Sequence, residues 1–152
     1  MTAGLGVMTI EMRFIEPEGA WYEAEKQLRE DVLRRPIGRI FDPNEFVFES
    51  ESLHFVALDG DRMVGCVLFH RRGRSGRLYQ MAVAPSHQGQ GLGRDLVLGL
   101  ERHLVAEGVE EVVLHARLTA TNFYRRLGYQ FSSEEYLELG IPHREMKRQL
   151  VP

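Results

Sequence analysis

The sequence predicts an α+β fold in which helices cover a mostly antiparallel sheet. Several short segments alternate apolar and polar residues, as half-buried strands do, whereas two longer segments carry apolar residues at helical spacing. Three successive strand-like segments are joined by turn signals, which predicts antiparallel neighbours. The expected order along the chain is therefore β, α, three strands, α, β, α, β, β, a layered arrangement of helices on a sheet.

The N-terminal third contains a strand, a helix and an irregular connection. Residues 8–15 alternate in polarity and are predicted to form the first strand, preceded by a loose N-terminus over residues 1–8. A helix is expected over residues 18–35, where Pro36 ends the helical pattern. Residues 37–52 mix Gly, Pro, Asn and acidic residues without a period, which predicts a surface loop of the kind that borders binding sites.

The middle of the chain is predicted to form an antiparallel meander followed by a helix. Two β-rich runs within residues 53–72 flank the turn sequence at 59–61, and a second turn at 73–76 leads into another strand. From Leu92, leucine and valine recur at helical spacing until Gly108, a residue type that commonly ends helices.

The C-terminal part is expected to return to strands around one short helix. A strand over 110–118, a short helix over 119–128, a strand over 129–139 and a last strand within 140–151 are predicted. The 152 residues are the size of one ordinary domain, so we expect a single domain over residues 1–152.

Composition excludes several classes of protein. The formal net charge of -3 gives no overall attraction to nucleic acid or to an anionic membrane, and no run of about eighteen apolar residues occurs. The only cysteine, Cys66, stands in an apolar run and is expected to be a buried thiol. The histidines lack metal-ligand spacing. We expect a cytoplasmic monomer or homodimer with no metal, no nucleic-acid partner and no membrane association.

A glycine-rich turn over residues 87–96 predicts an anion site. Such a turn between a strand and a helix collects backbone N–H groups at the positive end of the helix dipole. It does not match the dinucleotide fingerprint, because Arg94 stands where the third glycine is required, and the chain contains no Walker A string. A tight turn that binds nothing is the alternative.

Two segments carry sets of residues that match known motifs. Residues 81–104 contain Gln88, Gly91 and Gly93, and residues 119–129 contain Ala120, Phe123, Tyr124, Gly128 and Tyr129. The first segment resembles the acyl-CoA signature of the GNAT superfamily of N-acetyltransferases, and the second resembles that superfamily's second motif in the expected order. Residues 134–146 are similar to the tail of the small bacterial ElaA-like subgroup. One departure is Arg117, where many members carry asparagine before the second motif.

The resemblance implies a fold, a co-substrate and the residues that hold it. The fold would be the GNAT fold, a mixed, mostly antiparallel sheet of six to seven strands that is splayed between strands four and five. Acetyl-CoA would be the co-substrate of an N-acetyltransferase acting on a primary amine. The residues expected to bind it are Gln88, Gly89, Gln90, Gly91, Leu92, Gly93 and Arg94 at the pyrophosphate, Met81, Ala82 and Val83 along the pantetheine arm, and Asn122 in the second motif.

The chemistry requires an acid for the leaving thiolate and a base for the attacking amine. Tyr124 is the expected acid, because a phenol with a pKa near 10 keeps its proton at pH 7. Glu134 and His54 are candidate bases, and Glu51 and His143 are candidates for lining the acceptor site. The alternative is an acyl-CoA-binding sensor of the same fold that does not turn over. Acyl transfer to an alcohol or a thiol, and use of longer acyl chains, also stay open.

Overall fold

The structure, a computed structural model, describes residues 9–40, 42 and 44–150. The chain divides into two compact units, which we call the first unit (Met1–Leu68 and Gln80–Leu98) and the second unit (Phe69–Tyr79 and Gly99–Pro152). The predicted loose N-terminus lies outside the described residues, and the single domain stays a prediction. No helix in the described ranges is long and apolar enough to cross a membrane.

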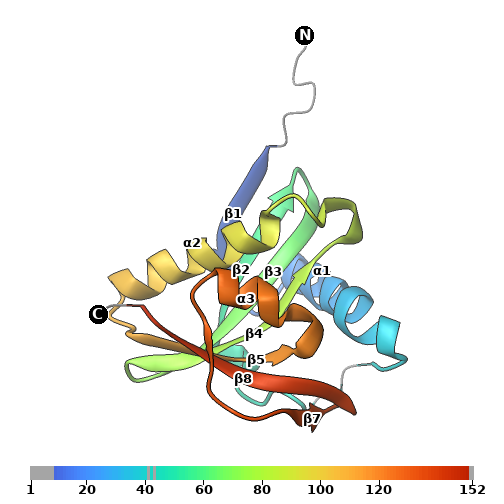
Figure 1. Cartoon of the computed structure of the whole chain (residues 1–152). Helices are drawn as coiled ribbons and strands as arrows, with labels where there is room; N and C mark the ends of the chain where they lie inside the picture. Colours follow the sequence, from blue (N-terminus) through green and yellow to red (C-terminus); the bar gives the residue numbers. More distant parts are fainter. Residues whose placement is uncertain (1–8, 41, 43, 151–152) are drawn as a thin grey trace. The chain divides into compact units, whose positions relative to one another are not determined.

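The first unit is built on antiparallel strands. It contains β1 (Ile10–Ile15), β2 (Leu53–Asp59), the first part of β3 (Arg62–Arg72) and the last part of β4 (Ser75–Val83). β1 pairs with β2 in a register that places Ile10 opposite Asp59 and Ile15 opposite His54. β2 and β3 form the hairpin predicted around residues 59–61 (Figure 1).

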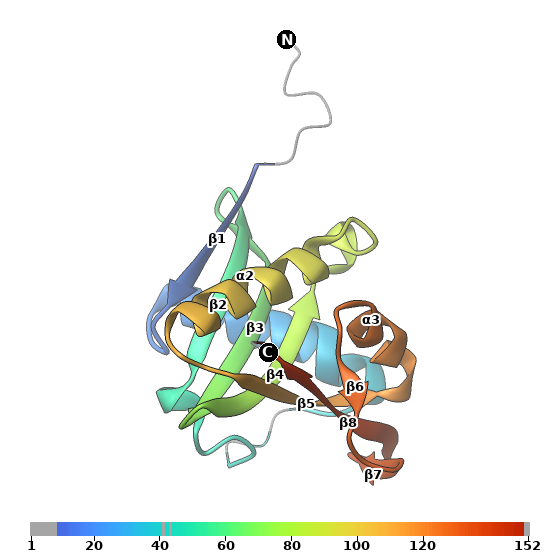
Figure 2. The ribbon, with the colours of Figure 1, turned by 60° about the vertical axis from the view of Figure 1, so that its left-hand side comes forward.

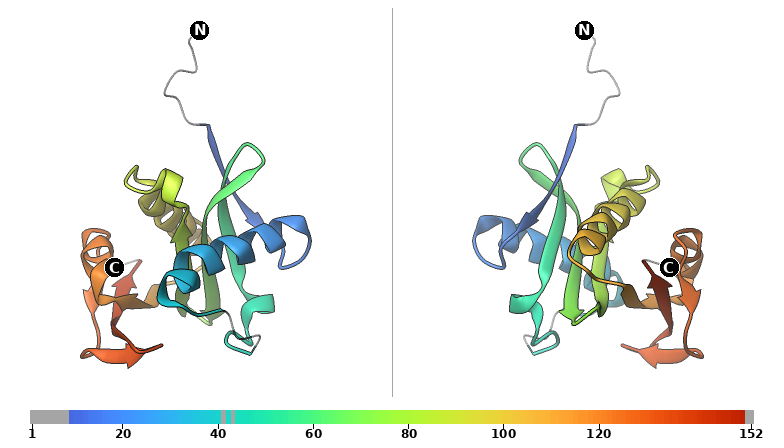
Figure 3. Two further views of the ribbon diagram at one scale, coloured as in Figure 1. Left: turned by 90° about the vertical axis from the view of Figure 1, so that its right-hand side faces the viewer. Right: turned by 90° about the vertical axis from the view of Figure 1, so that its left-hand side faces the viewer.

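Two helices cover opposite faces of these strands. α1 (Ala20–Arg29) lies on one face, and the first half of α2 (Leu92–Ala106) lies on the other (Figure 3). α2 approaches β3 closely, because a Cβ atom at Gly65 would stand 2.7 Å from the Leu96 side chain. α1 continues as a π-helical segment over Glu30–Arg34 and a 3-10 turn over Arg35–Ile37. The predicted helix is thus present but changes its winding near its end.

The second unit contains the remaining strands and α3. Its elements are the second half of α2, β5 (Glu111–Arg117), α3 (Thr121–Arg126), β6 (Gln130–Phe131), β7 (Tyr136–Glu138) and β8 (Ile141–Gln149). β5 pairs antiparallel with β8 from His143 to Gln149, and the short strands β6 and β7 also lie against β8 (Figure 2). The strand order is β1-β2-β3-β4-β5-β8-β6, with β7 beside β8.

The predicted α+β fold and its splayed sheet are confirmed. β4 pairs with β5 in parallel over Ser75–Leu78, and β4 then continues to Val83 beyond this paired segment. The described residues form eight strands rather than six or seven. The difference arises because residues 129–139, predicted to be one strand, form the two short strands β6 and β7 with a bend between them.

Candidate functional site

The glycine loop lies between β4 and α2, as the sequence predicts. A 3-10 turn over Pro85–His87 is followed by a turn in which Gly89 has φ 76° and Gly91 has φ 84°. These left-handed conformations favour glycine, because a Cβ atom would be strained there. The first bond of the helix runs from the Asp95 N–H to the Gly91 carbonyl at 3.0 Å.

The loop before α2 and the first turn of the helix are largely exposed. In a helix that begins at Leu92, the N–H groups of its first turn have no carbonyl within the helix to bond. Gly89, Gln90, Gly91 and Arg94 are exposed, and a Cβ atom at either Gly89 or Gly91 would meet no atom within 4 Å. The loop therefore has the geometry of an anion site at the positive end of a helix.

Side-chain hydrogen bonds fix the loop to neighbouring segments of the first unit. The Gln88 side-chain amide donates to the Val83 carbonyl at 2.9 Å. His87 is buried, and its Nε2 lies 2.9 Å from Asp59 Oδ2 while its Nδ1 lies 2.7 Å from Ser86 Oγ. His87 thus ties the loop to the β2–β3 hairpin.

The last residues of β4 follow an unusual backbone conformation. Gln80 has φ 54°, and beyond it Ala82 is buried whereas Met81 and Val83 are half-buried. A non-glycine residue in the left-handed region is uncommon and re-aims the chain that follows it. The three residues expected to pair with the pantetheine arm therefore begin directly after a bend in the backbone.

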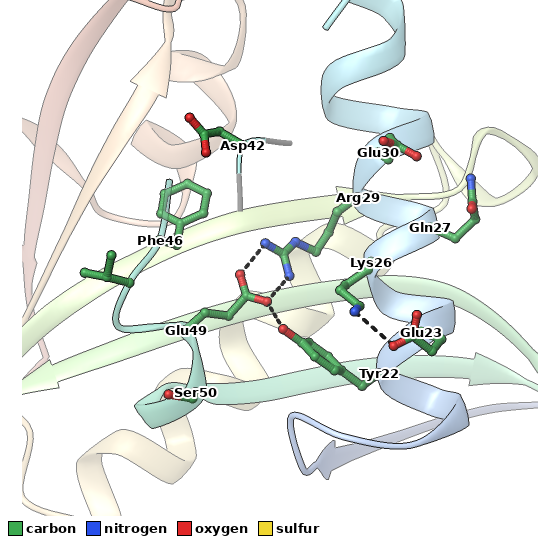
Figure 4. A pocket seen from close by; sticks show the side chains of 11 residues that line it. Tyr22, Glu23, Lys26, Gln27, Arg29, Glu30, Asp42, Phe46, Glu49 and Ser50 are labelled. Atoms are coloured by element: carbon green, nitrogen blue, oxygen red, sulfur yellow. Dashed lines mark hydrogen bonds and ion pairs between the residues drawn. The ribbon is translucent and has the colours of Figure 1, made fainter. Parts of the chain in front are cut away.

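A cavity of about 580 Å³ lies between α1 with its π-helical extension and the segment before β2 (Figure 4). Its lining residues are Tyr22, Glu23, Lys26, Gln27, Arg29, Glu30, Asp42, Phe46, Val47, Glu49 and Ser50. Four of these side chains are carboxylates and two are cations, so acidic groups predominate. All of them belong to the first unit.

Arg29 is the centre of a buried ion-pair network at the cavity. Its side chain is 3% exposed, and its Nη1 donates to Glu25 Oε2 at 3.0 Å. Both Nη atoms bind the Glu49 carboxylate, at 3.0 and 2.7 Å, and the Tyr22 hydroxyl donates to the same carboxylate (Figure 4). Burial alone would raise the pKa of Glu49, but the hydrogen bonds from Arg29 and Tyr22 outweigh it and hold that pKa below its usual value.

His54 completes this network as a cation. Its Nδ1 lies 2.8 Å from Glu25 Oε1, and its Nε2 lies 3.0 Å from the Glu49 carbonyl. A carboxylate and a carbonyl can only accept, so both ring nitrogens donate and the imidazole is protonated. Burial opposes this charge, but the hydrogen bond with Glu25 raises the pKa of His54 above its usual value. Both ring nitrogens of His54 are therefore engaged by acceptors of the protein itself, and its role as a base stays a prediction.

The protonated His54 predicts a pH-dependent stability. Because its pKa is raised on folding, its contribution to the free energy of unfolding is fully present below about pH 6.5 and is lost as pH rises through the folded pKa. We expect the difference in unfolding free energy between wild type and His54→Gln to shrink from pH 6 toward pH 9, measured by urea unfolding. His103→Gln, at a half-exposed histidine of α2, is the control. A difference that stays constant with pH would contradict the assignment.

The other sequence-predicted residues belong to the second unit. Tyr124 on α3 is buried, with its ring 4.9 Å from the Phe123 ring and 5.7 Å from the Tyr129 ring. Burial raises the pKa of its phenol, so the hydroxyl stays protonated near neutral pH. Asn122 on the same helix is exposed, as is Glu134 between β6 and β7.

His143 stands in a small polar cluster on β8. It is buried, and its Nδ1 donates to the Ile141 carbonyl at 2.7 Å. Its Nε2 lies 3.8 Å from Glu138, whose other oxygen lies 2.9 Å from His115 Nδ1. The hydrogen bond from His115 lowers the pKa of Glu138. Within the described part of the chain, no group of three or more His, Cys, Asp or Glu residues is arranged to hold a metal ion.

The acidic segment before β2, which the sequence predicts to line the acceptor site, contributes Glu49 to the cavity. Glu51 is exposed and does not line the cavity, whereas Glu49, two residues earlier, does. The sequence does not predict Arg29 and Tyr22 as site residues, because arginine and tyrosine are common in helices. The helical spacing that makes a buried face on α1 is the one local signal that could have indicated Arg29.

Comparisons with known proteins give one consistent family. The model of the acetyltransferase (GNAT) domain matches residues 25–150. The Bacillus subtilis (strain 168) protein YjcF, described as an uncharacterized N-acetyltransferase, is 35% identical over 101 residues, which are 66% of this chain and 72% of that protein. The fold is shared with Escherichia coli ElaA at a TM-score of 0.81 and 21% identity, covering 93% of this chain and 100% of that one. It is also shared with the PaiA N-acetyltransferase of Thermoplasma acidophilum, solved with coenzyme A, at a TM-score of 0.72 and 16% identity, covering 93% and 99%.

Proposed function

Because this chain belongs to the GNAT acetyltransferase family, we propose that it transfers the acetyl group of acetyl-CoA to a primary amine. The observation that carries the proposal is the glycine loop: exposed, left-handed at Gly89 and Gly91, and followed at once by the start of α2. The coenzyme A bound to the PaiA enzyme of the same fold supports the same ligand here.

The loop is the proposed pyrophosphate site. Backbone N–H groups between Gln88 and Arg94 would donate to the phosphate oxygens, with the helix dipole adding favourable potential. Gly89 and Gly91 have positive φ and carry no side chain, so the phosphates can approach the backbone closely there. Arg94 is exposed on the first turn and adds a positive charge there.

The backbone of Met81, Ala82 and Val83 is the proposed pantetheine site. The pantetheine arm carries two amides spaced like those of a peptide, and such an arm can pair with an exposed strand edge as an added strand does. β4 runs on past its parallel pairing with β5 at Ser75–Leu78. Its final residues are therefore the part of the strand whose hydrogen-bonding groups can serve a ligand.

The proposed reaction is a direct displacement at the thioester. A neutral amine attacks the carbonyl carbon, and its nitrogen, cationic in the tetrahedral species, releases a proton to solvent water. The carbon–sulfur bond breaks as that species collapses, and the departing thiolate takes a proton. Tyr124 is the proposed donor of that proton, since its buried phenol is protonated near neutral pH. A backbone N–H near Val83 would stabilise the negative charge that develops on the carbonyl oxygen.

The cavity beside α1 is the proposed acceptor site. Of its two cations, Arg29 is bound to Glu25 and Glu49, and Lys26 is paired with Glu23 at 2.9 Å. The carboxylate of Glu30 adds further negative charge to the cavity. An acidic cavity favours a positively charged partner. We therefore expect the acceptor to carry a positive charge in addition to the neutral amine nitrogen that reacts.

A thiol-release assay tests the proposal. Acetyl-CoA is mixed with the full chain and a panel of amines at matched concentration. The panel contains diamines and polyamines, amino acids with carboxylates, and alkylamines that carry no second charged group. We expect CoA release with the cationic members, with KM rising as salt screens the cavity. Amines that carry a carboxylate should be the poorest acceptors.

Calorimetry with CoA separates the enzyme from the sensor alternative. Binding of CoA without turnover on any amine, alcohol or thiol acceptor would support a sensor of the same fold. Absence of CoA binding would overturn both. Equal rates for anionic and cationic amines would leave the acetyltransferase intact and contradict the proposed acceptor site.

A further inference from the structure

One contact of Arg29 lies outside the ion-pair network described above. Its Nε donates to the Gln80 side-chain carbonyl, Oε1, at 3.1 Å. The two residues are 51 positions apart in the sequence, and the contact joins α1 to the last part of β4. The Arg29 guanidinium thus binds groups from three segments: Glu25 on its own helix, Glu49 before β2, and Gln80 on β4.

Gln80 needs such a contact because of its backbone. Gln80 and Leu139 are the two non-glycine residues with positive φ in the described part of the chain. A side chain makes this conformation costly, so surrounding contacts must hold it. The carbonyl of Gln80 accepts a weak hydrogen bond from Cys66 Sγ at 3.5 Å, and its side chain is held by Arg29.

The chemistry of guanidinium suits this double task. Its planar fork binds the Glu49 carboxylate through both Nη atoms, which leaves the Nε–H directed elsewhere. The position of Gln80 is therefore set by a group that is itself fixed by two carboxylates. A lysine ammonium at this place would be a point charge and could not hold the same set of partners in one plane.

We propose that Arg29 is a positioning residue for acetyl-CoA: through Gln80 it holds the bend of β4 and so aims the backbone of Met81–Val83 at the pantetheine arm. This inference rests on the proposed function. The same guanidinium fixes Glu49 in the wall of the proposed acceptor cavity. One buried side chain thereby sets the geometry of the edge that binds the donor and of the wall that faces the acceptor.

The test changes Gln80 and leaves Arg29 in place. Removing a buried guanidinium would leave two carboxylates without their counter-charge and would destabilise the fold. Gln80→Met keeps the length of the side chain without the acceptor oxygen, and Gln80→Glu keeps both. The dissociation constant for CoA is measured by calorimetry. We expect Gln80→Met to bind roughly 10-fold more weakly, as for the loss of a hydrogen bond to a charged group, and Gln80→Glu to retain most of the affinity.

Two further variants keep the result interpretable. Gln80→Gly removes the acceptor but adopts the left-handed conformation without a side-chain contact, so it should bind CoA more tightly than Gln80→Met does. Gln130→Met, at an exposed glutamine of β6, makes the same chemical change where no role is expected and should bind CoA as wild type does.

The outcomes distinguish this inference from the proposed function. If wild type fails to bind CoA, the proposed function and the inference fall together. If wild type binds CoA and Gln80→Met binds it equally well, the inference alone is overturned. Weak binding by Gln80→Glu as well would also overturn it, because the loss would then not follow the hydrogen bond.

Discussion

Replacing Tyr124 by phenylalanine is expected to lower kcat by about 10-fold to 10⁴-fold while the affinity for CoA stays unchanged. The phenol is buried and its pKa is raised by that burial, so the proton is present near neutral pH and is lost only in the variant. Without it, the thiolate must leave unprotonated or take its proton from water. Steady-state kinetics with an active amine, together with calorimetry with CoA, would measure both quantities.

Tyr129→Phe is the matched control for this prediction. Tyr129 is also buried, packs against Tyr124, and donates from its hydroxyl to Glu101 at 2.7 Å. Its loss should reduce stability, because a buried carboxylate loses a hydrogen bond, while kcat is retained. An unchanged rate and pH profile in Tyr124→Phe would exclude Tyr124 as the acid.

Gly91→Val is expected to abolish measurable CoA binding by calorimetry. Gly91 has φ 84°, and valine is strongly disfavoured there because its branched Cβ crowds the backbone. The added Cβ would meet no protein atom within 4 Å, so it would occupy the open space through which a phosphate approaches the loop. Both effects act on the loop and leave the core in place.

Gly73→Val separates the effect on binding from the effect on stability. Gly73 lies in the turn between β3 and β4, has φ 64°, and also has open space around its Cβ position. Both variants should lose about 1 to 2 kcal/mol of stability from the left-handed conformation. Only Gly91→Val should lose CoA; undiminished binding in that variant would contradict the loop assignment.

The fold was predictable from the sequence wherever a local pattern decides it. The alternation at the first strand, the turn residues at 59–61 and the leucine spacing of α2 each depend on neighbours along the chain, and each element is present. The split of residues 129–139 was missed because both short strands are specified by pairing with β8, a partner that comes later in the sequence.

The candidate site was predictable where a motif is contiguous and not where it is assembled in space. The residue type of Gly89 and Gly91 indicates their left-handed backbone, because glycine is the usual residue in that conformation. Gln80 also has a positive φ, but glutamine as a residue type does not indicate that conformation. The meeting of Arg29 with Glu49 and Gln80 is a tertiary contact, and no periodicity encodes which carboxylate of a loop will face a helix.

The burial of Cys66 has a practical consequence for every assay of this protein. The chain has one cysteine, its side chain is fully buried in β3, and burial raises the pKa of its thiol, so the reactive thiolate is scarce in the folded protein. A disulfide reagent added to an assay therefore reacts with the thiol of the CoA product and not with Cys66 of the folded enzyme. When the same reagent is added to a variant without substrate, we expect it to react only after unfolding of β3 has exposed Cys66. Its rate of reaction then measures loss of the fold.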